Sequence, residues 1–203
     1  MLRLLVAMLL CASAVPAQDP KPIPLPKPQT EGGKPLMQAL KERKSTREFS
    51  QEKLSRQVLS NLLWAAFGIN REDGRRTAPT ASNRQEIDIY VVMADGAYRY
   101  DAKANQLEPV AQGDLRAATG AQDFVAQAPL NVVYVADLAK QKNADWAYAD
   151  TGFIAQNVYL YCASEGLATV VRGMVPREPL VKALKLRPDQ RITLSQTVGY
   201  PKK

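Results

Sequence analysis

The chain of 203 residues contains no histidine and only two cysteines. The lack of histidine excludes Ser-His-Asp and Cys-His catalysis and removes the commonest metal ligand. Two cysteines cannot build a cysteine-based zinc site, so we expect no metal centre. The 27 lysines and arginines outnumber the 20 acidic residues without forming a long basic run. That pattern disfavours nucleic acid as a partner and suits an anionic ligand.

The first 17 residues carry an apolar run that is too short to span a bilayer comfortably. Arg3 flanks this run, and Val15-Pro16-Ala17 fits a small-residue cleavage site. This order predicts a signal peptide cleaved after Ala17 and export to the periplasm or the medium. Cys11 leaves a lipoprotein alternative open, although Leu10 is larger than the usual lipobox residue.

The mature chain would keep Cys162 as a lone thiol, which we interpret as a small buried hydrophobe without an intrachain disulfide. Residues 18–35 contain six prolines and predict an extended, exposed linker, either a simple spacer or a segment lying across a partner subunit. Residues 36–203 are long enough for one domain with a sizeable core.

Apolar periodicity and turn residues divide this domain into helices and strands. Helical spacing predicts helices at 35–44, 55–68, 114–118, 121–127, 150–166 and 179–184. Alternating or continuous apolar runs predict strands at 87–93, 98–100, 106–110, 131–136, 167–171 and 191–198. Helices wrapped around a small, mostly antiparallel sheet give the α+β class.

The most strongly apolar helix is expected to begin at Asp150 or Thr151 and to end at Gly166, where glycine accepts a left-handed conformation. Its apolar residues cover much of its circumference. The helix is therefore expected to be buried on most sides, either in the core of its own domain or against a second subunit.

Two polar stretches are candidates for ligand contacts. Residues 43–47 place three cations and two hydroxyl groups at the end of a helix, which is either a solvated turn or a cradle for an anion such as phosphate. Residues 70–82 form a polar loop, and such loops often hold ligand contacts.

Four motifs, in order, resemble the nitroreductase superfamily of FMN-dependent oxidoreductases, including its small thiazole/oxazole dehydrogenase-like branch. They are R-K-S-T-R-E-F at 43–49, P-T-A-S-N-R-Q at 79–85, D-x-G-x-x-x-Q-N at 150–157 followed by E-G-L-A-T at 165–169, and V-G-Y-P at 198–201. Each motif alone is weak evidence for the family, but the four together, in the right order, are strong evidence and cover residues 35–201.

The resemblance implies a domain-entwined homodimer with two FMN sites at its interface. Arg43 and Ser45 would hold the phosphate or the ribityl oxygens, and Arg47 would stabilise the negative charge of the reduced flavin. The polar loop would contact the flavin from the other subunit. The full set of implied FMN contacts is Arg43, Lys44, Ser45, Arg47, Thr80, Ala81, Ser82, Asn83, Val171, Arg172, Gly173 and Lys202.

Two residues depart from the family pattern. Glu86 stands where many members have proline, and Arg172 stands where glycine or glutamate is usual. The Arg172 side chain either covers the reactive edge of the flavin or turns to solvent.

The resemblance further implies an enzyme with two half-reactions: a donor such as NAD(P)H reduces the flavin, and a small acceptor such as a nitroaromatic or quinone reoxidises it. No protein acid or base is obligatory, because the cofactor supplies the chemistry. The alternative is an exported flavin-binding or structural dimer without turnover, since reduced nicotinamides are not expected in the periplasm.

Overall fold

The computed structural model describes residues 21–203. The predicted signal peptide at 1–17, with Cys11, lies outside the described residues. Among the helices that are described, none has the length and apolar character needed to cross a membrane.

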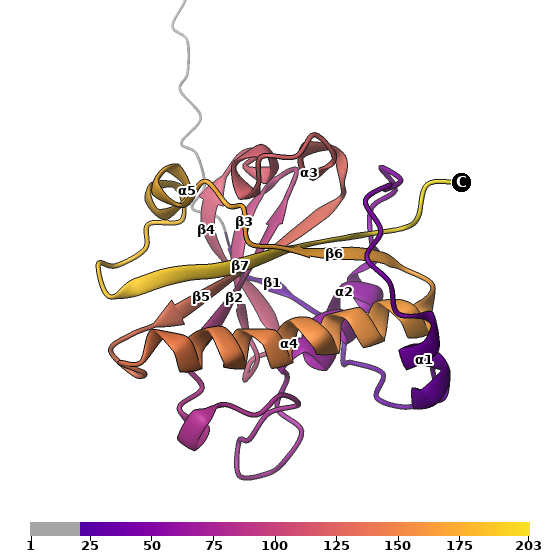
Figure 1. Ribbon diagram of the computed structural model, residues 1–203, viewed down its shortest axis with the longest axis horizontal. Coiled ribbons are helices and arrows are strands. Elements are labelled where there is room, and N and C mark those ends of the chain that lie inside the picture. Colours follow the sequence, from indigo (N-terminus) through magenta and orange to yellow (C-terminus); the bar gives the residue numbers. More distant parts are fainter. Residues whose placement is uncertain (1–20) are drawn as a thin grey trace, which may run out of the picture.

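Seven strands form one antiparallel sheet with the spatial order β1-β4-β3-β2-β5-β7-β6 (Figure 1). The strands are β1 (Ile23–Pro24), β2 (Ile87–Met93), β3 (Gly96–Asp101), β4 (Gln106–Gln112), β5 (Leu130–Asp137), β6 (Ala168–Arg172) and β7 (Gln190–Gly199). Every residue of β5 is buried, so this strand lies at the centre of the core. The α+β class predicted from the sequence is confirmed.

Helices cover both faces of the sheet. The helical elements are α1 (Leu36–Glu42), α2 (Arg56–Phe67), α3 (Phe124–Gln127), α4 (Ala144–Glu165) and α5 (Arg177–Ala183), with 3-10 turns η1 (Ala81–Asn83) and η2 (Arg116–Thr119). Helices α2 and α4 pack on the face to which β2 contributes Ile87, Ile89 and Val91. Helix α5 packs on the other face, which receives Tyr90 and Val92. The strand's alternation therefore fills two separate cores.

Helix α4 begins six residues before the predicted start. Asn143 is its N-cap, and the Asn143 side chain accepts the Asp145 amide at 2.9 Å. Asp150 and Thr151 lie inside the helix, where the Thr151 hydroxyl donates to the Ala147 carbonyl. The predicted end is confirmed, because Gly166 has φ 71°.

The outward side of α4 remains partly uncovered. Ile154, Val158 and Cys162 point inward and are buried, and burial raises the pKa of the Cys162 thiol. In contrast, Trp146 and Phe153 are 51% and 49% exposed. The apolar side chains of α1 are exposed as well; they are Leu36, Met37 and Leu40. The described chain therefore does not cover all of the apolar surface that its helices present.

The first described residues form an extended, mostly exposed segment that pairs with the sheet. Strand β1 pairs with β4, and Leu25 is buried against the core. The carbonyl of Pro26 accepts hydrogen bonds from the Ser60 hydroxyl and from the Asn105 amide. The predicted extended conformation is present and most residues from 21 to 35 are exposed, but the segment also completes the edge of its own sheet.

Candidate functional site

The segment at 43–47 follows α1 and lies against the C-terminal half of α4. The Arg43 guanidinium carbon is 5.2 Å from the centroid of the Tyr159 ring, and the Ser45 hydroxyl lies 2.8 Å from the Tyr159 hydroxyl. The Thr46 amide donates to the Thr169 carbonyl of β6 at 2.9 Å. Lys44 and Arg47 are exposed, so their charges face solvent and remain available to a ligand.

Tyr159 connects three of the predicted cofactor contacts, although the sequence did not single it out. Besides its contacts to Arg43 and Ser45, its hydroxyl accepts the Val171 amide at 3.0 Å. The available signal was chemical, because a buried tyrosine hydroxyl usually finds a polar partner.

A cavity of about 650 Å³ opens beside this segment. Its wall includes Lys34, Lys41, Lys44 and Lys202, together with Tyr159. The C-terminal residues reach it because the Lys202 amide donates to the Glu48 carbonyl and Pro201 pairs with Phe49. Glu42 and Glu48 also line the cavity, and Lys34 is paired with Glu42 at 2.6 Å. The lysines still outnumber the acids, so the opening favours an anionic group.

The second predicted cluster, 80–83, lies against the N-terminal half of α4. The Ala81 amide donates to the Asp150 carboxylate at 2.9 Å, and the Gln85 amide donates to the Thr80 hydroxyl. Ser82 and Asn83 both have φ 53°, and Gln85 has φ 48°. Left-handed backbone at a residue other than glycine costs roughly 1–2 kcal/mol. The loop is thus held in a strained conformation, which is common at functional sites.

The two clusters do not meet within one chain. Their anchors on α4 are Asp150 and Tyr159, and nine helical steps of about 1.5 Å separate them by about 14 Å. Figure 1 shows the same arrangement: α1 lies near the C-terminal end of α4, and the loop that contains η1 lies near its N-terminal half. The described chain therefore presents two half-sites along one helix.

The third predicted cluster, 171–173, divides between the two faces of the sheet. The Val171 side chain packs on the core that α2 and α4 cover, and its amide donates to the Tyr159 hydroxyl. Gly173 is exposed, and a Cβ at this position would meet only Leu194, at 3.9 Å. The space around Gly173 is open, so its own chain does not require glycine there.

The side chain of Arg172 adopts neither of the two predicted positions. The residue is 5% exposed and neither covers a ligand site on the α4 face nor turns to solvent. Its guanidinium donates to the Thr119 carbonyl at 2.8 Å and to the Asn131 side chain at 3.1 Å, on the opposite face of the sheet. Burial lowers the pKa of Arg172 to about 10. The prediction failed because a cation at the end of a strand usually stays in solvent.

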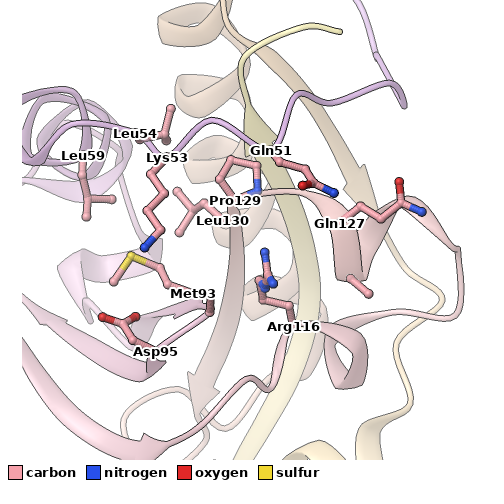
Figure 2. Close-up of a pocket in the computed structure, with 12 residues that line it drawn as sticks. Gln51, Lys53, Leu54, Leu59, Met93, Asp95, Arg116, Gln127, Pro129 and Leu130 are labelled. Atoms are coloured by element: carbon pink, nitrogen blue, oxygen red, sulfur yellow. The ribbon is translucent and has the colours of Figure 1, made fainter.

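A separate cavity of about 370 Å³ lies near the start of α2 and the turn between β2 and β3 (Figure 2). Leu54, Met93 and Leu130 supply apolar walls, and Lys53 and Arg116 lie at its margin. The charge of Arg116 is already paired, because its guanidinium is 2.7 Å from Asp114. No predicted cofactor residue lines this cavity.

Within residues 21–203 there is no group of three or more acidic, cysteine or histidine side chains arranged to hold a metal ion.

Comparison with known proteins assigns the family. The sequence model of the nitroreductase family matches residues 40–200, and the chain therefore belongs to the nitroreductase family of FMN-dependent oxidoreductases. The protein MJ1384 of Methanocaldococcus jannaschii, named as a nitroreductase, is 29% identical over 168 residues, which are 75% of this chain and 85% of that protein.

Solved structures show the same fold. A protein of Ralstonia eutropha JMP134 assigned to the nitroreductases is 44% identical, covers 98% of this chain and 97% of its own, and has a TM-score of 0.86. A nitroreductase-type protein of Desulfovibrio desulfuricans, solved in complex with FMN, is 22% identical with a TM-score of 0.64 and covers 85% of this chain and 89% of its own. At that identity the second likeness concerns the fold alone.

The buried position of Arg172 generates a stability prediction. Arg172→Ala should lower the free energy of unfolding by about 2–3 kcal/mol, because it leaves a cavity in the core. Arg172→Met should lower it by less than about 1 kcal/mol, because it keeps the volume and removes a poorly solvated charge. Urea denaturation measures both.

Arg191→Ala is the matched control, since Arg191 is exposed on β7 and its loss should change stability by less than about 0.5 kcal/mol. Equal stability of all three variants would contradict the structural role assigned to Arg172.

Proposed function

We propose that the chain binds FMN and passes electrons from a donor such as NAD(P)H to a small acceptor such as a nitroaromatic or quinone. The observation that carries this proposal is the lysine-lined cavity beside Arg43, Ser45 and Tyr159, at the position of the family's cofactor motif. The FMN bound to the related fold from D. desulfuricans supports the choice of cofactor.

The chemistry of the donor set fits FMN. Arg43, which lies over the Tyr159 ring, offers a planar fork of N–H donors, and Lys44 and Lys202 add positive charge at the neighbouring cavity. Charge-assisted hydrogen bonds of this kind are the strongest that a phosphate dianion can receive. Ser45, already placed by Tyr159, would bind the phosphate or a ribityl hydroxyl.

The protein's part in the reaction is to bind, orient and balance charge. Bound FMN supplies two-electron redox chemistry in two half-reactions, one with the donor and one with the acceptor. Arg47, which is exposed beside the cavity segment, would stabilise the negative charge that reduction adds. With no histidine in the chain, we assign no obligatory acid or base.

We infer further that the working form is a homodimer. The half-sites at 43–47 and 80–83 lie along α4, and Phe153 is exposed between their anchors. A second copy whose α4 runs antiparallel would bring the loop of one chain to the 43–47 segment of the other. The same contact would cover Trp146 and Phe153 of α4, together with the exposed apolar side chains of α1.

Export remains a proposal that depends on residues 1–17 alone. Intact mass of the mature protein would decide between cleavage after Ala17 and lipid attachment at Cys11. Reduced nicotinamides are not expected in the periplasm, and this is the argument for the alternative of an exported flavin-binding or structural dimer without turnover.

A test of catalytic turnover distinguishes an enzyme from a flavin-binding or structural dimer. The purified protein should be yellow, should lose its flavin absorbance anaerobically when NAD(P)H is added, and should recover it when a quinone is added. Stopped-flow absorbance measures both steps. A yellow protein that reacts with none of a panel of donors would favour the alternative without turnover.

Arg43→Ala should weaken FMN binding by about 1.5–3 kcal/mol, the scale of a hydrogen bond to a charged group. Flavin titration of the apoprotein measures the change. Lys103→Ala, an exposed cation in the turn between β3 and β4, is the control and should bind normally. Unchanged affinity in Arg43→Ala would place the phosphate elsewhere.

Phe153→Glu should produce a monomer that retains little flavin, because it puts a charge in the centre of the proposed contact. Light scattering together with flavin absorbance tests this. Tyr148→Glu, on the same helix but turned to a different side, should stay dimeric. A Phe153→Glu monomer with full flavin content would refute a site shared between subunits.

A further inference from the structure

The loop at 79–85 ends at Glu86, a residue with an unusual environment. Its side chain is fully buried, and neither carboxyl oxygen accepts a hydrogen bond from an N–H group or a hydroxyl in the described part of the chain. An ionised carboxylate without donors is strongly disfavoured in a protein interior. The residue must therefore bind a proton or lie beside a group that compensates its charge.

The group beside Glu86 is another acid. Asp150 of α4 is 3% exposed, and its Oδ2 already accepts the Ala81 amide at 2.9 Å. Burial, together with a side-chain hydrogen bond to Asp150, raises the pKa of Glu86 to about 7. Two carboxyl groups can form that bond only when one of them carries a proton.

The surrounding charges do not replace this proton. Lys140, in the turn after β5, is exposed and only weakly lowers the pKa of Glu86. Asp137 is paired with Arg187 at 2.9 Å, and Asp88, next on β2, has its own pKa raised by burial. No cation among the described residues forms a salt bridge with either Glu86 or Asp150.

We propose that Glu86 and Asp150 share one buried proton, and that the singly protonated pair positions the strained loop which carries the FMN contacts Thr80 to Asn83. The cofactor part of this inference rests on the proposed function. Protonated Glu86 donates to Asp150, and the remaining negative charge on Asp150 strengthens its bond to the Ala81 amide. That bond holds the loop while Ser82, Asn83 and Gln85 are in left-handed backbone.

The direction of the pH effect follows from the raised pKa. The folded chain keeps the proton that an unfolded chain would lose near the ordinary glutamate value of 4.5, so this contribution to folding is present below that value and is lost as pH rises to about 7. Above about 7, two adjacent buried charges repel each other. The loop then opens more often, and its affinity for FMN falls.

Two variants distinguish the role of the shared proton from that of the charge on Asp150: Glu86→Gln and Asp150→Asn. The side-chain amide that Glu86→Gln introduces would donate permanently to Asp150, so this variant should keep the loop closed at every pH. Asp150→Asn removes the charged acceptor of the Ala81 amide and should loosen the loop at every pH. Asp145→Asn is the matched control, an exposed acid in the first turn of the same helix.

The primary measurement is hydrogen exchange of the Ala81 amide in apoprotein, corrected for the intrinsic pH dependence. Protection in the unaltered chain should fall about fivefold from about pH 7 to about pH 8, because the protonated fraction falls from about one half at the pKa to about one tenth at one pH unit above it. Glu86→Gln should show no such fall. An equal fall in both proteins overturns the proposal.

The second measurement is FMN titration of the same proteins at both pH values. A loss of affinity at the higher pH in the unaltered chain, absent in Glu86→Gln, supports the proposal. If no variant binds FMN while Ala81 protection depends on Glu86, the acid pair stands and the proposed function fails. If FMN binds with a pH dependence that Glu86→Gln shares, the acid pair does not position the loop.

Infrared spectroscopy of the unaltered protein covers the case in which the variants fold poorly. A buried protonated carboxyl band at about pH 6 should disappear as pH rises through about 7. Absence of this band at the lower pH overturns the shared proton.

Discussion

The packing of α4 across the sheet determines where both half-sites lie. Its inward residues Ile154 and Val158 enter the main core, while the Thr151 hydroxyl is 2.9 Å from that of Thr193 on β7. These contacts prevent the helix from sliding or turning. Asp150 and Tyr159 are therefore held at a fixed spacing. This spacing sets the separation of the segments that they contact, 80–83 and 43–47.

The two half-sites use different physical means to place a ligand. At Tyr159 one hydroxyl joins Ser45 to the backbone of Val171, so neutral hydrogen bonds order a positively charged opening. At Asp150 a buried negative charge holds strained backbone. The first half-site is suited to an anionic group, and the second presents short polar side chains and backbone in an unusual conformation.

The sequence predicted the framework because its information was local. Strand β2 has the predicted bounds, since Ile87, Ile89 and Val91 alternate in a pattern that any half-buried strand needs. The ends of α2 and α4 at Gly68 and Gly166 were also correct, as glycine and the flanking apolar residues are sufficient signals.

The sequence failed where a contact from a distant segment decided the outcome. Asp150 looked like a helix cap, but its carboxylate accepts an amide from the 79–85 loop, and Asn143 caps the helix instead. Arg172 looked like a ligand contact, but a carbonyl group from η2 and a side chain from β5 surround it. No local pattern reports such partners, so these roles needed the fold.

The proline-rich segment at residues 22–26, which pairs with β4, affects whether the edge of the sheet can pair with another copy of the protein. The Leu25 amide points to β4, where it donates to the Asn105 carbonyl at 3.0 Å. In a strand, alternate residues point their amides to opposite sides, so the outer side belongs to positions 22, 24 and 26. All three are prolines and have no N–H to offer. At the β1 edge the sheet thus ends in a strand whose outer side offers no N–H, which disfavours pairing with another strand at that edge.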